Sequence, residues 1–442
     1  MAVQRYAIIG SGVAAIAAAQ AIREKDTLSE LLLISDERAG YYSRPGLAYL
    51  LSDEIPEAQL YPLNDKDFQH LKVKRIYGRV ARIDPPKHLI IFQDQTNVTY
   101  TRLLLATGAQ ASRLTLPGSD LQGIITLDTI QDARDLLQLT RQARSALVVG
   151  GGITALEITE ALLARKLKTH YFIRGQRFWS NVLDKSESRL VENRLKERGL
   201  QIHFNTEVRE ILGQRGKLTG VRTQGGNVLN VDLLALAIGV QPRVELAQAA
   251  GLSIERGILV NEKMQTNVAD IFAAGDVAQV FDPASGKYVL DSLWTPARYQ
   301  GRTAGLNMAG ASENYLRTAP VNVSRLADIP VTIIGAVGRG ADQDLVGIAR
   351  GESESWSLMP EAISIETKNA VNRVRVTVGQ QTMIGALVLG DQTISRALQD
   401  LITHQVDISA IRHQLQQPDA PITKIITDFW VEYSRGNGRQ AK

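Results

Sequence analysis

The stretch Tyr6-Ala7-Ile8-Ile9-Gly10-Ser11-Gly12-Val13-Ala14-Ala15 carries the main fold signal of the first part of the chain. Its apolar start predicts a short buried strand, and the alanine-rich run 16–22 that follows predicts a helix. Gly10 permits the tight turn between them, Gly12 lets a phosphate approach the backbone, and Ala15 lets the helix pack closely on the strand. Because free N–H groups at a helix start attract phosphate, the stretch predicts a dinucleotide-binding unit.

An acidic residue follows the next apolar strand. Residues 31–34 read Leu-Leu-Leu-Ile, and Asp36 comes just after them. A carboxylate at this place can accept both ribose hydroxyls of an adenosine. The alternative, a plain α/β turn without a ligand, leaves Asp36 unexplained.

The same unit returns in the middle of the chain. Residues 145–149 form a second apolar strand, and Gly150, Gly152 and Ala155 repeat the spacing of the first turn. A helix is expected over 156–166. The sequence therefore predicts two dinucleotide-binding units.

The strand after the second unit ends in a positive charge. Residues 169–173 are followed by Arg174, which stands where the first unit has Asp36. A guanidinium cannot accept ribose hydroxyls, but it can bind a 2′-phosphate in a bidentate manner. Arg177 is near enough in sequence to help, so we expect a preference for NADPH. The alternative is that both arginines are solvated charges beside a site that takes NADH.

Composition excludes several kinds of chemistry. The chain has 442 residues, no cysteine and six scattered histidines. It can form no disulfide, thiolate zinc site, cysteine-held iron–sulfur cluster or thiol redox pair, and we expect no metal site. The net charge of +4 comes without basic runs, so nucleic acid is not an expected partner. Apolar windows are too short to span a bilayer and the chain opens directly in a strand, so we expect a cytoplasmic protein.

Three further strands end in recognisable motifs. Residues 103–108 end in Ala106-Thr107-Gly108, residues 233–239 end in Gly239, and residues 266–276 end in Gly275-Asp276. The order of these motifs with the two glycine turns resembles the pyridine nucleotide–disulfide oxidoreductase superfamily, the flavoprotein reductases with two dinucleotide folds. The resemblance covers roughly residues 5–320.

The resemblance implies an α/β fold. Two Rossmann-like domains would bind FAD and NAD(P)H, and a small α+β domain would follow. The FAD domain would comprise residues 1–112 and 242–320, the NAD(P)H domain residues 113–241, and the C-terminal domain residues 321–442. In the family the last domain packs on the FAD domain and, in several relatives, makes the dimer or partner contact. A homodimer is therefore one arrangement that the resemblance implies.

Tyr42-Ser43-Arg44-Pro45 is similar to a segment of rubredoxin and ferredoxin reductases, of the flavin part of assimilatory nitrite reductases and of apoptosis-inducing factor. By this resemblance Arg44, with Pro45 beside it, would contact the FAD pyrophosphate, Asp276 the ribityl chain and Val80 the adenine. The motif residues Ala106, Thr107, Gly108, Gly239 and Gly275 would line the cofactor sites.

Three residues would lie near the reacting rings. By resemblance Glu157 faces the nicotinamide and Trp294 lies beside the isoalloxazine. The alternatives are an exposed or capped helix acid and a core or interface tryptophan. Tyr49 stands where many relatives have a lysine near flavin N5, and it lacks the fixed charge that stabilises an anionic reduced flavin.

The segment 422–433 is partly apolar and carries Phe429 and Trp430. It favours a docking helix over a membrane anchor.

The resemblance implies an FAD-dependent NAD(P)H oxidoreductase. A hydride would pass from the nicotinamide to flavin N5, and electrons would then leave without a thiol. A small iron redox protein of the ferredoxin or rubredoxin type is the favoured acceptor. A quinone, another small acceptor or oxygen is the alternative. A further hypothesis assigns a different kind of function: a redox-sensing or interaction flavoprotein that resembles apoptosis-inducing factor.

Overall fold

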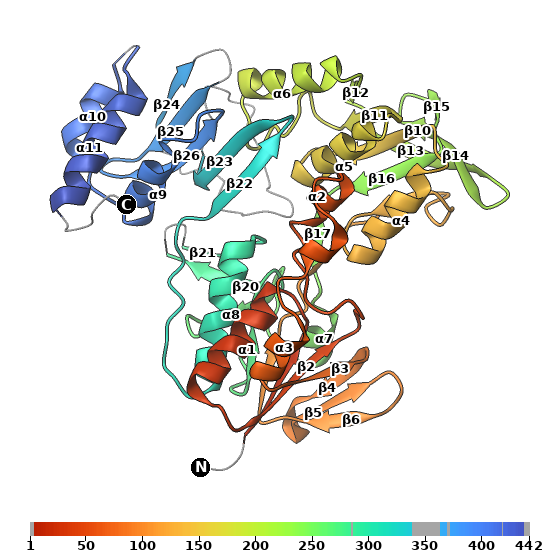
Figure 1. The fold of residues 1–442 in the computed structure, drawn as a ribbon, viewed down its shortest axis with the longest axis vertical. Coiled ribbons are helices and arrows are strands. Elements are labelled where there is room, and N and C mark those ends of the chain that lie inside the picture. The colour runs from red at the N-terminus through yellow and green to blue at the C-terminus, as the bar shows by residue number, and fades with distance from the viewer. Residues whose placement is uncertain (1–3, 284–285, 338–362, 369–371, 418, 437–442) are drawn as a thin grey trace.

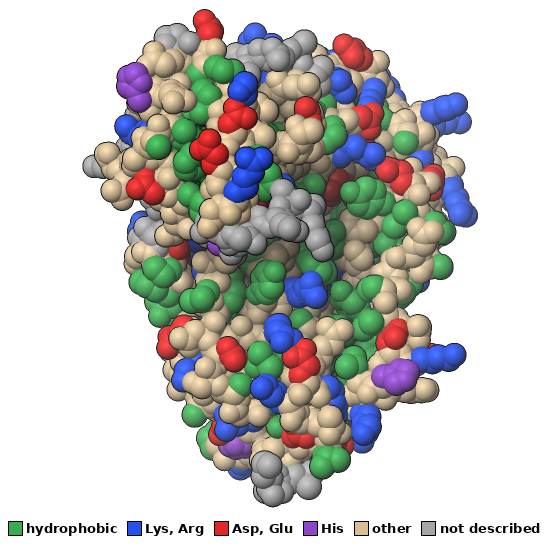
Figure 2. Space-filling view, turned by 60° about the vertical axis from the view of Figure 1, so that its left-hand side comes forward, with side chains coloured by type: hydrophobic (Ala, Val, Ile, Leu, Met, Phe, Trp, Pro, Cys, Tyr) green, Lys and Arg blue, Asp and Glu red, His purple; other side chains and the backbone are tan. Residues whose placement is uncertain are grey.

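A computed structural model describes residues 4–283, 286–337, 363–368, 372–417 and 419–436. The chain forms three lobes, each built on one five-stranded sheet (Figure 1). The lower lobe carries the N-terminus, and the two upper lobes lie above it. Figure 2 shows a face hollowed across its middle, where hydrophobic side chains gather around the hollow. The predicted α/β class is confirmed.

The lower lobe is built on a five-stranded parallel sheet in which four strands are mostly buried and the edge strand 73–77 is half-buried to exposed. Strands buried on both faces read as continuous apolar runs, as residues 31–34 do. The order is β19 (Ile271–Ala273), β7 (Arg102–Leu105), β1 (Arg5–Ile9), β2 (Glu30–Ser35) and β3 (Val73–Tyr77). Two smaller sheets complete the lobe: β4 (Val80–Asp84), β5 (Leu89–Phe92) and β6 (Asn97–Thr99), and β18 (Ile258–Val260), β20 (Ala278–Asp282) and β21 (Lys287–Val289).

Two helices cross in close contact in this lobe (Figure 1). They are α1 (Val13–Lys25) and α8 (Trp294–Met308). A Cβ at Gly301 would lie 2.1 Å from the carbonyl oxygen of Ala14, and one at Gly305 would lie 2.4 Å from that of Ala18. Only glycine allows this approach, which fixes the start of α1 against the rest of the lobe. The other helices are α2 (Leu47–Leu51), α3 (Asp65–His70), α7 (Glu245–Ala249) and the 3₁₀ turns Glu57–Leu60 and Pro85–Lys87.

The second lobe, at the upper right of Figure 1, repeats the parallel sheet. Its order is β12 (Gln201–Phe204), β11 (Lys168–Ile173), β10 (Ser145–Gly150), β16 (Leu233–Ala237) and β9 (Ile124–Thr126). It contains α4 (Ile130–Thr140), α5 (Ile153–Ala164), α6 (Lys185–Glu197) and the antiparallel β13 (Val208–Gln214), β14 (Lys217–Thr223) and β15 (Val228–Asn230). The strands β8 (Ala109–Ala111) and β17 (Val240–Pro242) pair antiparallel where the chain enters and leaves the lobe.

The helix α2 belongs to the N-terminal part of the sequence but packs on the second lobe. Its residues Leu47, Leu50 and Leu51 are buried in the same apolar cluster as the core of that lobe. Figure 1 shows α2 beside α5. The segment that follows Arg44 therefore bridges the two dinucleotide lobes.

The third lobe has an antiparallel sheet covered by helices. Its strands are β22 (Val321–Leu326), β23 (Ile329–Gly335), β26 (Met383–Leu389), β25 (Arg373–Val378) and β24 (Ile363–Lys368). Its helices are α9 (Ser395–Thr403), α10 (Ser409–Leu415) and α11 (Ile422–Gly436). Phe429 and Trp430 of α11 pack against the core of this lobe, and the Trp430 indole N–H donates to Asp400 at 3.0 Å. Here α11 is a docking helix, as its sequence favoured.

The third lobe docks on the second through a buried ion pair. The guanidinium of Arg375 donates to both carboxylate oxygens of Glu187 on α6 at 3.0 and 3.1 Å, and both side chains are 1% exposed. It also donates to the carbonyls of Val337 and Val182 at 2.5 and 2.6 Å. We expected this domain to pack on the FAD domain. Its described residues contact both dinucleotide domains: Arg375 pairs with Glu187 of the second lobe, and Arg325 of β22 pairs with Glu54, which belongs to the FAD-domain sequence.

Candidate functional site

The first glycine turn joins β1 to α1. A Cβ at Gly10 would lie 2.1 Å from the carbonyl oxygen of Ala106, and its φ is +122°, so this position requires glycine. Gly12 is the N-cap of α1, has no atom within 4 Å of a would-be Cβ, and leaves the first turn without a side-chain cap. Ala15 is fully buried. Open backbone N–H groups at a helix start fit a diphosphate.

The end of β2 holds two acids that differ in their surroundings. Asp36 is exposed, as a carboxylate that meets ribose hydroxyls would need to be. Glu37 is turned inward, and it accepts from the Tyr42 hydroxyl at 2.8 Å and from the guanidinium of Arg44. Tyr42 also accepts the backbone N–H of Ile130 at 3.0 Å, which links this segment to α4 of the second lobe.

Arg44 lies between the two dinucleotide lobes. It donates to a carboxylate oxygen of Glu37 and to the backbone carbonyl of Asp128, and its guanidinium lies 5.2 Å from the centroid of the Tyr42 ring. Pro45, next in the chain, is exposed in the turn before α2. The arginine predicted to meet the FAD pyrophosphate is thus oriented by groups from both lobes.

Asp276 follows Gly275 directly after β19. Burial raises its pKa to about 6, the cations Arg44 and Arg243 oppose that rise, and Asp128 adds to it. A would-be Cβ at Gly275 would lie 3.1 Å from Ala14 near the start of α1. Asp276 therefore lies near the first glycine turn, where its carboxyl group could accept a hydrogen bond from a polyol chain.

The Ala-Thr-Gly motif ends β7 at the same edge of the sheet. The Thr107 hydroxyl donates to the carbonyl of Arg243 at 3.0 Å, and the Arg243 backbone N–H donates to the carbonyl of Gly108 at 2.9 Å. Ala106 is buried beside Gly10. Gly239 lies just before β17, where its carbonyl accepts the backbone N–H of Ser112 at 2.9 Å.

The second glycine turn joins β10 to α5 in the same way. A Cβ at Gly150 would lie 2.3 Å from the carbonyl oxygen of Ala237 and 2.8 Å from the Cβ of Ala155, which is fully buried. Gly152 is the N-cap of α5, again without a side-chain cap. By contrast α4 and α6 of this lobe start with capping boxes, Thr129 with Asp132 and Asp184 with Glu187. The start of α5 thus keeps its N–H groups available to phosphate.

Glu157 lies on α5, one turn after Gly152. Burial raises the pKa of its carboxyl to about 8, with a smaller contribution from Glu160 on the same helix. A carboxyl group that is still protonated near neutral pH can donate a hydrogen bond, whereas an ionised carboxylate can only accept one. Glu157 can therefore act as a donor toward a ligand.

The two predicted phosphate arginines differ in their positions. Arg174 is exposed immediately after β11, at the carboxyl edge of the sheet. Arg177 is buried, and it donates to the carbonyls of Leu183 and Ser180 at 3.4 Å each. Arg174 is thus the guanidinium that faces solvent at this edge, and Arg177 supports the turn from within.

The remaining predicted residues lie on separate elements. Val80 begins β4 and packs partly buried against the core of the lower lobe. Tyr49 on α2 is 43% exposed, and Trp294, the first residue of α8, is 42% exposed. The guanidinium of Arg298 lies 5.6 Å from the centroid of the Trp294 ring. Both aromatic rings are accessible to a ligand or partner.

The sequence reasoning missed three charged residues of the lower site. Glu37 binds Arg44, and Asp128 accepts Arg243 at 2.5 Å on its carboxylate and Arg44 on its carbonyl. The available signals were small: Glu37 follows Asp36, Asp128 precedes the capping Thr129, and Arg243 follows the Gly239 motif. No sequence spacing predicts that Asp128 contacts Arg44, 84 residues away, or Arg243, 115 residues away.

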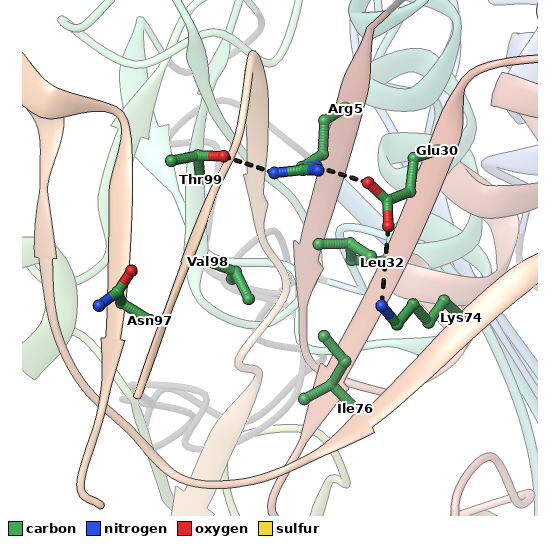
Figure 3. A pocket seen from close by; sticks show the side chains of 8 residues that line it. All are labelled: Arg5, Glu30, Leu32, Lys74, Ile76, Asn97, Val98 and Thr99. Atoms are coloured by element: carbon green, nitrogen blue, oxygen red, sulfur yellow. Dashed lines mark hydrogen bonds and ion pairs between the residues drawn. The ribbon is translucent and has the colours of Figure 1, made fainter. Parts of the chain in front are cut away.

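A separate pocket of about 270 Å³ lies at the opposite edge of the lower sheet (Figure 3). Arg5 and Glu30 begin β1 and β2, so they mark the amino ends of strands whose carboxyl ends carry the glycine turn. Glu30 accepts from Arg5 at 2.5 Å and lies 3.8 Å from Lys74. Because ligands of such sheets bind at the carboxyl ends of the strands, this pocket is not part of the dinucleotide site.

The described residues contain no cluster of three His, Asp or Glu side chains that could hold a metal ion. Within the same part of the chain, no helix is long and apolar enough to cross a membrane.

Comparisons with known proteins agree with this geometry. The family described as pyridine nucleotide-disulphide oxidoreductase matches residues 4–301. An NADH oxidase of Methanocaldococcus jannaschii is 28% identical over 87% of this chain and 88% of its own. The ferredoxin–NAD(+) reductase component of the biphenyl dioxygenase system of Paraburkholderia xenovorans is 34% identical over 62% of this chain and 68% of its own. The crystal structure of a ferredoxin reductase for the CYP199A2 system of Rhodopseudomonas palustris matches with a TM-score of 0.83 at 22% identity, over 95% of this chain and 99% of that one.

Proposed function

The chain belongs to the pyridine nucleotide-disulphide oxidoreductase family, and from that premise we propose that it is an FAD-dependent NAD(P)H oxidoreductase whose acceptor is a small iron redox protein. The observation that supports this most is the pair of glycine turns. Each lies at the carboxyl edge of its own parallel sheet, and each opens a helix with no side-chain cap. With no cysteine in the chain, no electron can pass through a protein thiol.

The lower lobe would hold FAD. Gly12 and the start of α1 would bind the diphosphate together with Arg44, Asp36 would accept the adenosine ribose, and Asp276 would bond the ribityl chain. When bound, FAD supplies the acceptor for the hydride of the nicotinamide and can release electrons singly. Protein residues supply position and polarity.

The second lobe would hold the nicotinamide cofactor. The start of α5 at Gly152 would bind its diphosphate. Glu157, whose carboxyl burial keeps protonated near neutral pH, would donate a hydrogen bond to the nicotinamide amide carbonyl. The exposed guanidinium of Arg174 would bind the 2′-phosphate of NADPH. Tyr49 and Trp294 present accessible rings that could contact the flavin ring or the acceptor.

The acceptor is proposed from the relatives and from the missing thiols. The Paraburkholderia relative carries ferredoxin in its name, which supports an iron redox protein. The Methanocaldococcus relative is named an NADH oxidase, which supports oxygen as a second candidate.

Anaerobic stopped-flow reduction of the bound flavin by NADPH and by NADH tests the donor half of the proposal. Faster reduction by NADPH supports binding of the 2′-phosphate by Arg174, and faster reduction by NADH refutes that role. If neither cofactor reduces the flavin, the proposed reductase function is refuted. Steady-state turnover with a purified ferredoxin, with a rubredoxin and with oxygen alone then separates the acceptors. Turnover that is equal with and without an iron protein overturns the iron-carrier proposal in favour of an oxidase.

A further inference from the structure

We propose that Arg243 is a second guanidinium of the FAD site, which binds the FAD diphosphate beside Arg44 while Asp128 of the other lobe orients both. This inference rests on the proposed function and names a residue of the site that no motif predicts.

Arg243 is fixed to the end of the Ala-Thr-Gly motif. Its backbone N–H donates to the carbonyl of Gly108 at 2.9 Å, its carbonyl accepts the Thr107 hydroxyl at 3.0 Å, and its side chain donates to the carbonyl of Thr107 at 3.2 Å. The preceding residue of that motif, Ala106, is the one whose carbonyl excludes a Cβ at Gly10. Arg243 is therefore held close to the first glycine turn.

Two guanidiniums converge on one residue there. Arg243 donates to the carboxylate of Asp128 at 2.5 Å, and Arg44 donates to the backbone carbonyl of the same residue. Thr107 and Gly108, which hold Arg243, follow the carboxyl end of β7, and β7 pairs in parallel with β1, which leads into the first glycine turn. Arg243 therefore lies at the same edge of the sheet as the open N–H groups that begin at Gly12.

Each arginine keeps donors for an anion. A guanidinium has five N–H groups, and the side-chain hydrogen bonds that the structure describes use two groups in Arg243 and two in Arg44. Their side chains are 30% and 38% exposed, so ligand oxygens can reach them. Guanidiniums held by carboxylates in a fixed direction suit bidentate binding of phosphate oxygens.

The competing explanation is a brace. In that case Arg243 and Asp128 would only hold the two lobes together, and removing either partner would have the same effect. If Arg243 binds the diphosphate, loss of Arg243 should weaken the ligand, whereas loss of the negative charge of Asp128 should not.

Binding of FAD and of ADP to protein stripped of flavin tests the proposal, with folding checked by circular dichroism. Arg243→Gln should raise the dissociation constants of both ligands roughly 10- to 100-fold, because a charged hydrogen bond is lost. Both ligands should respond, since ADP contains the diphosphate of FAD but not its flavin. Asp128→Asn removes only the charge, because asparagine keeps a side-chain oxygen that can accept from Arg243 and the backbone carbonyl that accepts from Arg44. Both arginines therefore stay oriented, and the dissociation constants should change by less than about threefold. Arg302→Gln, on an exposed pair with Glu24, is the matched control and should leave both unchanged.

Other outcomes overturn the proposal. Equal losses in Arg243→Gln and Asp128→Asn identify a brace, and a loss for FAD but not for ADP places Arg243 at the flavin ring. If Arg243→Gln does not fold, Arg243→Lys keeps the charge and should still weaken ADP about threefold to tenfold; no change refutes the proposal. Wild-type protein that binds no FAD refutes the proposed function itself, whereas tight FAD binding by both wild type and Arg243→Gln refutes this inference alone.

Discussion

Removal of the buried guanidinium of Arg375 should destabilise the contact between the second and third lobes. In Arg375→Met, the carboxylate of Glu187 stays buried without its cation, which costs about 3–5 kcal/mol when one partner of a buried pair is removed. The carbonyls of Val337 and Val182 also lose a donor. Glu187 keeps the backbone N–H of Asp184 at 2.8 Å, which limits the loss. We expect a net cost of about 3–4 kcal/mol.

The cost should depend on pH in a defined direction. Burial raises the pKa of Glu187 and Arg375 opposes that rise, so removing Arg375 raises the pKa further. A protonated Glu187 carboxyl has no charge left unpaired by the loss of Arg375. The loss of stability in Arg375→Met relative to wild type should therefore shrink as the pH falls. For the same reason, adding Glu187→Gln to Arg375→Met should recover most of the loss, since glutamine keeps an oxygen for the N–H of Asp184.

Native-state hydrogen exchange of the amides in β25 and β26 measures the free energy that opens this lobe. The control is Arg302→Met, whose pair with Glu24 is 48% and 47% exposed and should contribute less than about 1 kcal/mol. A cost for Arg375→Met no larger than that of the control would refute the reasoning. So would a double variant as unstable as the single one.

Three further predictions concern the cofactor sites. Arg174→Glu should weaken NADPH about 10- to 100-fold and NADH by less than about threefold in equilibrium titrations, because a charged hydrogen bond contributes about 1.5–3 kcal/mol; equal losses would remove Arg174 from the 2′-phosphate. Glu157 has a folded pKa of about 8 against 4.5 ordinarily, so its contribution to stability is lost as the pH rises through about 8. Glu157→Gln should therefore flatten the fall in urea midpoint between about pH 5 and about pH 9, and an unchanged slope would contradict the raised pKa. Gly10→Ala would place a Cβ 2.1 Å from the carbonyl of Ala106 at a φ of +122°, so strain of about 1–3 kcal/mol and loss of bound FAD, seen in the flavin absorbance, are expected; full retention of FAD would contradict that geometry.

The sequence alone predicts the type of the elements around each glycine turn. The expected helix 16–22 lies inside α1 and the strand 169–173 lies inside β11, whereas the helix expected over 156–166 begins three residues and ends two residues earlier, as α5 (Ile153–Ala164). Both kinds of element follow from local sequence patterns. A buried strand appears as a short apolar run, and the glycine turn Gly-x-Gly indicates that a helix begins directly after it. The absence of cysteine likewise excludes a thiol relay on chemical grounds alone.

Which charged side chains pair with one another follows from the tertiary structure. Asp128 is 84 residues from Arg44 and 115 from Arg243, and Arg375 is 188 residues from Glu187, so no local spacing could pair them. Parallel strands bring their carboxyl ends to one edge whatever their order in sequence, and residues just beyond those ends are brought together there.

Burial was the other property that local sequence could not supply. Arg174 and Arg177 are three residues apart and alike in chemistry, yet the first is exposed and the second is buried. The turn after β11 folds back so that backbone carbonyls, those of Leu183 and Ser180, surround Arg177. Local sequence is enough to identify the two dinucleotide units and the chemistry that a chain without thiols cannot perform. Only the packing of the lobes decided which of its charged groups remain accessible to a ligand, because desolvation depends on what the rest of the chain places around each group.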